Sequence, residues 1–254
     1  MRTLLDFPRI LFVVSLLVLW LSARLGASWR KRRELDDEMR EDFGVVLAAT
    51  LTLLGLIIAF TFSMATTRYD LRKNYEEAEA NAIGTEYVRA DLMPPESAAK
   101  MRTLLRTYID QRILFYTVRD QRRVKQINDY TAQLQSQLWS SVTTPAKEQP
   151  TPVIALAVAG MNDVLNSEGY TQAAWWNRIP TAGWVLMIVI AICCNLLMGF
   201  AARRVEKEAL LLTVLPLILS ISFFLIADID SPRGGLIRIQ PQNLVSLRDS
   251  LPTQ

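Results

Sequence analysis

Four long apolar runs constrain this 254-residue chain more than any other feature of its sequence. The second and third, residues 43–65 and 181–202, contain no charged side chain, and the first and fourth cover residues 7–25 and 209–227. A helix of about 20 residues is about 30 Å long, which matches the hydrocarbon thickness of a bilayer. Because such a helix also satisfies its own backbone hydrogen bonds in lipid, each run predicts a transmembrane helix.

Two other readings of these runs are less favoured. Core helices of a soluble protein would need far more polar surface to cover them than the rest of the chain provides. The first run could also be a signal peptide, because Leu25-Gly26-Ala27 resembles a cleavage site. The basic cluster 30–33 follows directly, however, which favours a retained helix. We therefore predict an all-α integral membrane protein with four transmembrane helices, in contact with the lipid bilayer.

A polar segment, residues 66–180, separates the second and third predicted spans. It has few glycines and no strand-like alternation, and its first part continues the second helix as far as Pro94-Pro95. Further helices are expected from Pro95, with Ser97 as a cap, then to about Val142, and over residues 153–165. The predicted plan is a helix pair in residues 1–65, an extramembrane helical block in 66–180, a second pair in 181–227 and a tail in 228–254.

Basic residues in the short loops predict the orientation in the membrane. With four spans, both termini and the polar segment lie on one side. The loop 24–42 has six basic residues and the loop 203–208 has three, so the positive-inside rule makes these loops cytoplasmic and the polar segment external. Basic residues directly beyond the second span favour the opposite orientation: Arg68, Arg72 and Lys73.

Small and hydroxyl-bearing residues recur on one face of the second span. They repeat at intervals of three or four positions through Ala48, Thr52, Gly55, Ala59, Ser63, Thr66 and Asp70. One interpretation is close helix packing within a subunit. The other is that copies of this face surround a symmetry axis and line a polar path, where Phe60 or Phe62 forms a hydrophobic constriction. The pore-lining candidates are Thr52, Gly55, Ala59, Phe60, Phe62, Ser63 and Thr66.

Acidic residues near the ends of the spans are the second group of candidates. Asp228 and Asp230 leave the fourth span, where they either cap a turn or form a ring that selects cations. With Asp70 they are the candidate residues of a charged mouth. Glu79 and Glu86 lie further along the second helix, and we expect them on a solvated face with charge pairs rather than at a metal. The sequence 233–239 predicts a tight turn and a tail that docks on the polar segment.

Several kinds of chemistry are excluded by composition. The chain has no histidine, its two cysteines are adjacent, and it has no glycine-rich phosphate loop. Its net charge is +3, too balanced to indicate nucleic-acid binding. We therefore expect no enzyme activity, no metal, no cofactor and no nucleic-acid partner.

Two segments resemble a known family. They are LLGLIIAFTFSMATTRYDLRKNYEEAEANAIGTEYVRADLMP and DSPRGGLIRIQPQNL. Together with the last two spans they are similar to the bestrophin-like family of bacterial membrane proteins, which have two helices, a helical middle domain and two more helices. The resemblance covers residues 44–92, 183–227 and 230–242. It implies a location in the bacterial inner membrane.

A more distant analogy to the bestrophins themselves implies a function. Bestrophins are pentameric ion channels in which the second helix lines the pore and aromatic or aliphatic side chains form a neck. By that analogy the chain is a channel-like homo-oligomer that conducts ions of unspecified identity along its second span. The alternative is a non-conducting membrane scaffold or sensor whose helical block binds a protein partner or an envelope signal.

Overall fold

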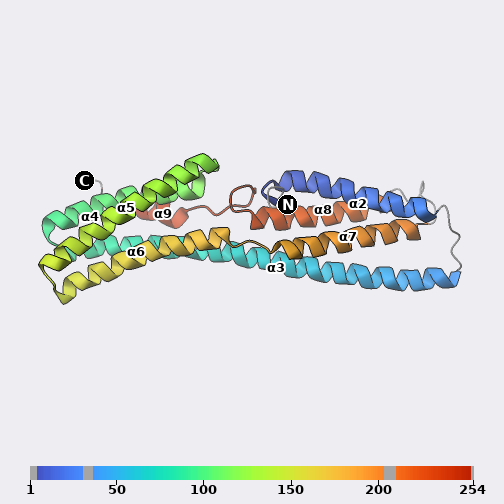
Figure 1. Cartoon of the computed structure of the whole chain (residues 1–254), viewed down its shortest axis with the longest axis horizontal. Coiled ribbons are helices and arrows are strands. Elements are labelled where there is room, and N and C mark those ends of the chain that lie inside the picture. The colour runs from blue at the N-terminus through green and yellow to red at the C-terminus, as the bar shows by residue number, and fades with distance from the viewer. Residues whose placement is uncertain (1–4, 31–36, 203–209, 253–254) are drawn as a thin grey trace. The chain divides into compact units, whose positions relative to one another are not determined.

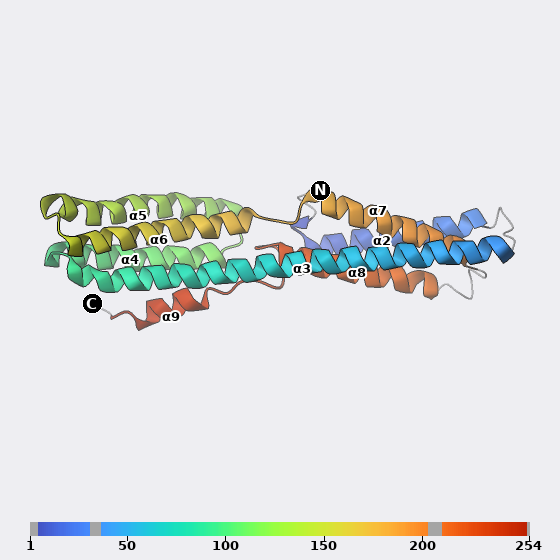
Figure 2. The same ribbon diagram turned by 90° about the horizontal axis from the view of Figure 1, so that it is seen from below.

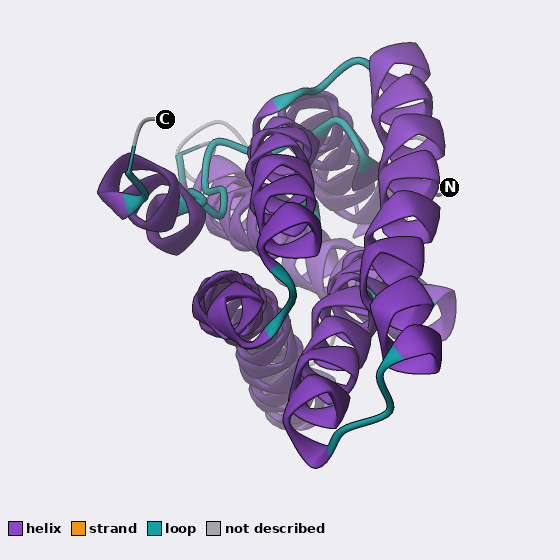
Figure 3. Ribbon diagram, turned by 90° about the vertical axis from the view of Figure 1, so that its left-hand side faces the viewer, coloured by secondary structure: helices purple, strands orange, loops and turns teal. Residues whose placement is uncertain are grey.

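The computed structural model describes residues 5–30, 37–202 and 210–252. Within these residues every regular element is a helix (Figure 3), which confirms the predicted all-α class. The helices in chain order are α2 (Pro8–Arg30), α3 (Asp37–Arg89), the 3-10 turn η1 (Ala90–Leu92), α4 (Pro95–Thr117), α5 (Gln121–Glu148), α6 (Pro152–Trp176), α7 (Thr181–Ala201), α8 (Leu211–Asp230) and α9 (Gln242–Ser250).

Four helical segments are long and apolar enough to cross a membrane. They contain most of each of the four apolar runs of the sequence and belong to α2, α3, α7 and α8. The basic residues on which the predicted orientation depends are largely outside the described part of the chain: Lys31, Arg32, Arg33, Arg203, Arg204 and Lys207.

The chain divides into two compact units. The first, here the membrane unit, is residues 1–68 and 178–238, and the second, here the block unit, is residues 69–177 and 239–254. Helix α3 continues without a break from one unit into the other (Figure 2).

Helices α2, α7 and α8 pack together in the membrane unit (Figure 1). Trp184, Met187 and Phe223 are among its fully buried core residues. Two glycines allow α2 and α7 to approach closely, because a Cβ on Gly26 would lie 2.1 Å from the Leu196 carbonyl oxygen and one on Gly199 would lie 1.9 Å from that of Ala23. Small residues at such crossings are typical of membrane helices.

The block unit consists of α4, α5 and α6 with the second half of α3 and the short α9. Its core includes Met101, Leu105, Ile109, Leu138 and Val164, all fully buried. As predicted, α3 ends just before Pro94-Pro95, where the prolines cannot continue its hydrogen-bond ladder.

The other helix ends predicted in this region were wrong in detail. Helix α4 begins at Pro95 with no side-chain cap, so Ser97 does not cap it. Helix α5 continues past Val142 to Glu148, because the buried Pro145 lies in its last turn and removes only one backbone donor. Helix α6 covers Pro152–Trp176 instead of residues 153–165, and the Thr151 side chain accepts a hydrogen bond from the Ile154 amide (3.2 Å) to begin it.

Candidate functional site

The small face of α3 is exposed in the single chain. Ala48, Thr52, Gly55, Ala59 and Ser63 are all exposed, and Thr66 is half-buried. A Cβ placed on Gly55 would meet no atom within 4 Å. The face therefore does not pack within the subunit, and the close helix contact considered for it from the sequence is made instead by α2 and α7.

A different stripe of the same helix contacts the rest of the membrane unit. Leu54, Thr61 and Ala65 are buried there, with Leu51 and Ile58 partly buried beside them. At about 100° per residue, this stripe is centred about 120° around the helix from the small face. In the most apolar 18-residue stretch of α3 only 6% of residues are buried, against 50% in that of α8. Most of the membrane part of α3 is therefore left uncovered by its own chain.

The threonine hydroxyls of this part of α3 are satisfied locally. Thr52 donates to the Ala48 carbonyl (2.9 Å), Thr66 to that of Phe62 (3.1 Å) and Thr67 to that of Ser63 (2.9 Å). Each hydroxyl uses its only donor in this contact, and its oxygen keeps a lone pair that can accept a further hydrogen bond. The small face thus presents hydrogen-bond acceptors to whatever lies against it.

The two candidate constriction residues occupy different positions around α3. Phe60 is 63% exposed and Phe62 is 44% exposed. At about 100° per residue, Phe62 lies at the edge of the small face, whereas Phe60 lies well away from it. Of the two, Phe62 has the position that a constriction next to this face requires.

Asp228 and Asp230 are not exposed charges, contrary to their expectation as mouth residues. Asp228 is 2% exposed, and its two carboxylate oxygens accept hydrogen bonds from the amides of Leu236 (2.7 Å) and Ile237 (2.8 Å). It therefore holds the turn that follows α8. Gly234 and Gly235 allow this turn to fold closely, because a Cβ on Gly235 would lie 2.4 Å from the Asp228 carbonyl oxygen.

Asp230 has a similar structural role. It is 1% exposed, accepts a hydrogen bond from the Ile179 amide (3.1 Å) and forms an ion pair with Arg178 (3.3 Å), which also pairs with Asp6. Both carboxylates therefore have structural partners within the chain, and of the three charged-mouth candidates they are the two that are buried. Asp70 remains exposed.

Glu79 and Glu86 in the second half of α3 are buried, so the prediction that they lie on a solvated face was wrong, although Glu77 beside them is exposed. Glu79 forms an ion pair with Arg112 of α4, and its Oε2 accepts hydrogen bonds from Tyr116 and Thr171, both at 3.2 Å. Arg112 also lies 3.7 Å from Glu168 and 4.5 Å from the centroid of the Phe115 ring. All polar contacts of this buried charge network lie inside the block unit.

The electrostatics of this network favour its charged form. Burial alone would lower the pKa of Arg112, but Glu79, Tyr108 and Glu168 together outweigh it and raise the pKa above its usual value. Burial, and then the charge of Glu79, raise the pKa of Tyr116. Arg112 therefore stays charged, and Tyr116 stays a hydrogen-bond donor.

Two further glutamates on α3 have different surroundings. Glu76 accepts hydrogen bonds from the Leu244 amide (3.0 Å) and the Asn243 side chain (2.7 Å) at the start of α9, which confirms that the tail docks on the block. Glu86 is fully buried, yet neither of its oxygens accepts a hydrogen bond from a described residue. The guanidinium of Arg89 lies 3.9 Å from it, and burial raises its pKa to about 8.

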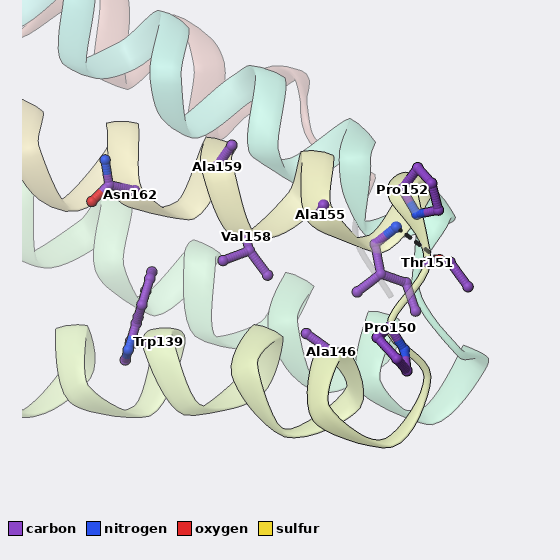
Figure 4. A pocket seen from close by; sticks show the side chains of 10 residues that line it. Trp139, Ala146, Pro150, Thr151, Pro152, Ala155, Val158, Ala159 and Asn162 are labelled. Atoms are coloured by element: carbon purple, nitrogen blue, oxygen red, sulfur yellow. Dashed lines mark hydrogen bonds between the residues drawn. The ribbon is translucent and has the colours of Figure 1, made fainter.

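An apolar groove lies between the end of α5 and the start of α6 (Figure 4). Trp139, Ala146 and Val158 line it, together with the loop residues 150–152. No group of three or more acidic or cysteine side chains that could hold a metal ion is found among the residues described.

Sequence reasoning found the small face but missed Arg112 and misjudged Arg72. Arg72, counted above as a vote on orientation, is 1% exposed and donates to the carbonyls of Ala174 (3.1 Å) and Asn177 (3.0 Å) at the end of α6. The available signal was the helical spacing of Arg72, Glu76, Glu79 and Glu86, which places them along one side of α3.

Comparison with known proteins gives a matching family model and several similar solved structures. A family model described as Bestrophin-like domain matches residues 9–244. A bacterial bestrophin homologue from Klebsiella pneumoniae has a similar crystal structure, with a TM-score of 0.61 and 14% identity over 95% of this chain and 98% of that one. A single-residue variant of that homologue gives a TM-score of 0.62 at 14% identity, over 93% and 98% of the two chains. Among curated proteins, no sequence match was found.

Proposed function

This chain belongs to the bestrophin-like family, and on that premise we propose that it is a homo-oligomeric channel whose conduction path is lined by the small face of α3. The observation that carries the proposal is that this face is exposed although it is built for close contact. Gly55 has open space around it, whereas Gly26 and Gly199 at the α2–α7 crossing are in close contact with the backbone of the other helix. A face of small residues that its own subunit does not cover is available to a symmetry-related copy or to a narrow path.

The chemistry of the face suits passage of water and ions. The hydroxyls of Thr52 and Thr66 on this face donate to backbone carbonyls, so their oxygens remain available as hydrogen-bond acceptors. Phe62 at its edge supplies an apolar constriction, and the exposed Asp70 supplies a charge beyond the end of the span. By the bestrophin analogy the number of subunits is five, and the identity of the ion is left open.

The proposal includes a location in the inner membrane of a bacterium. The short loops then lie in the cytoplasm and the block unit lies outside, as the basic residues of the loops favour.

Ion flux through the reconstituted full chain tests the proposal, with two matched variants. Ala59→Trp introduces a bulky side chain on the small face, and Leu53→Trp introduces the same side chain on an exposed position about 120° around the helix. We expect liposomes with the unmodified chain to conduct above empty liposomes. Ala59→Trp should lower the flux by about tenfold or more, which corresponds to about 1.4 kcal/mol of added barrier, while Leu53→Trp should leave it unchanged.

The mass of each variant in detergent separates a blocked path from a lost assembly. Equal flux through both tryptophan variants, or no flux through the unmodified chain under several ions and voltages, would contradict the proposal. In the second case the non-conducting scaffold is favoured. The apolar groove of Figure 4 is then the first surface on which to search for a partner.

A further inference from the structure

Four basic side chains lie within seven residues at the turn from α4 to α5. This basic cluster comprises Arg119, Arg122, Arg123 and Lys125, all of which are exposed. None of them forms an ion pair with another residue in the described part of the chain. The acid among them, Asp120, accepts a hydrogen bond from the Arg123 amide (2.8 Å) and so caps α5 instead of neutralising a neighbour.

Contacts inside the block unit fix which end of the block carries this cluster. The last turn of α4 packs against the last turn of α6, with ring centroids 4.8 Å apart for Phe115 and Trp175 and 5.5 Å apart for Tyr116 and Trp175. Arg119 follows Tyr116 by three positions. The basic cluster therefore lies at the end of the block where α6 finishes.

The chain leads from that end of the block directly into a membrane helix. Trp175 precedes Thr181, the first residue of the membrane helix α7, by six positions, and six residues span at most about 20 Å. Trp176 is 74% exposed, as is typical of aromatic side chains at a membrane interface. Headgroups extend several ångströms beyond the hydrocarbon, and charges act over a Debye length of about 8–10 Å. The basic side chains thus lie at the end of the block from which the chain enters the membrane helix α7.

We propose that the basic cluster binds the anionic phospholipid headgroups of the leaflet that faces the block unit. The four charges are spread over an exposed turn and are not gathered around a pocket, so they fit an extended anionic surface better than one small phosphate ligand. Juxtamembrane groups of four or more basic residues are known to bind such surfaces through nonspecific electrostatic attraction. The proposal does not depend on conduction, because a non-conducting scaffold would have the same cluster.

Lipid retention by the full chain tests the proposal. The protein is equilibrated with equal amounts of phosphatidylglycerol and phosphatidylcholine in mixed micelles, and the retained lipids are counted by mass spectrometry. Arg122→Gln with Arg123→Gln should lower the preference for phosphatidylglycerol about fivefold per removed charge. Lys100→Gln with Lys147→Gln removes the same charge from exposed positions at the other end of the block and should leave the preference unchanged.

A local probe shows where the lipid acts. A solvent-sensitive fluorophore on Gln126→Cys, in a chain whose two natural cysteines are replaced by alanine, should shift to the blue in nanodiscs with phosphatidylglycerol and not in pure phosphatidylcholine. Added salt should reverse the shift, and glycerol phosphate in solution should not cause it. An unchanged lipid preference in the Arg122/Arg123 variant, an equal loss in the Lys100/Lys147 variant, or an equal shift with glycerol phosphate would each overturn the proposal.

Discussion

The membrane part of α3 and its continuation in the block unit belong to one helix, but the first exposes most of its apolar side chains and the second buries four charged ones. In residues 42–65 the apolar side chains are largely exposed, and Phe60 and Leu53 are 63% and 48% exposed. In residues 69–89 the buried positions include Arg72, Glu76, Glu79 and Glu86, each at most 1% exposed.

This contrast shows that polarity alone does not decide burial in a chain that occupies two solvents. Exposing an apolar side chain to lipid costs no hydrophobic free energy, because the lipid tails are equally apolar. One buried stripe is therefore enough to attach the membrane part of α3 to its unit. In the block unit, water solvates exposed charges well. A buried charge there must be paired and hydrogen-bonded to avoid a large desolvation penalty, as Glu79 is.

The largest expected effect comes from removing one partner of the buried pair. Arg112→Met leaves the Glu79 carboxylate buried without its cation and should lower the free energy of unfolding by about 3–5 kcal/mol. Unfolding of the full chain in detergent, followed by loss of helical signal, measures the change. Leu53→Ala, on the exposed membrane part of the same helix, should change it by less than about 0.5 kcal/mol.

A double variant distinguishes loss of pairing from loss of packing. Glu79→Leu combined with Arg112→Met removes both charges and should recover most of the stability lost in the single variant. Recovery of none of it would mean that the shape of the arginine, and not the unpaired carboxylate, explains the loss.

A second, smaller effect compares two glycines of the membrane unit. Gly199→Ala places a Cβ 1.9 Å from the Ala23 carbonyl oxygen, so α2 and α7 must separate, and we expect a loss of about 1–3 kcal/mol. Gly55→Ala meets no atom within 4 Å and, because alanine favours a helix interior over glycine, should be neutral or stabilising by up to about 1 kcal/mol. Thermal unfolding in detergent provides the comparison, and equal losses for the two variants would show that the small face of α3 is covered within the subunit.

Much of the architecture was predictable because membrane spans follow from local composition. An uncharged run such as residues 43–65 needs no information about its neighbours to be assigned as a helix. The end of α3 before Pro94-Pro95 could likewise be predicted from the local sequence. The full lengths of α5 and α6 could not be predicted in this way, because tertiary packing stabilises helical turns that a proline such as Pro145 would otherwise end.

The candidate site was only partly predictable for the same reason. Spacing on one helix was enough to find the small face through Gly55, but not to show that its own chain leaves it open. The role of Glu79 depends on Arg112, which lies 33 positions away on another helix. Asp228 instead binds amides only eight and nine positions away, in the turn that the sequence already suggested. No local pattern distinguishes a buried paired carboxylate from a solvated one.

A pH-dependent effect concerns Glu86, which shares the buried face of α3 with Glu79 but has no comparable partner. Burial raises its pKa from 4.5 to about 8, although the charge of Arg89 lowers it, and the charge of Asp163 adds to the rise. The folded chain therefore holds a proton that the unfolded chain releases above its ordinary pKa. The resulting contribution to stability is complete below about pH 4.5 and is lost as the pH rises towards 8.

We expect the free energy of unfolding to fall across this window with a slope of at most about 1.4 kcal/mol per pH unit from this group. Glu86→Gln keeps the shape of the side chain without a titrating group and should remove that slope. Relative to the unmodified chain, the free energy of unfolding of the variant should therefore rise as the pH approaches 8. Glu77→Gln, at an exposed position of the same helix, should leave the slope in place. Melting temperatures of the three chains at several pH values between 4.5 and 8 measure it, and the same slope in all three would show that Glu86 is hydrated in the folded chain.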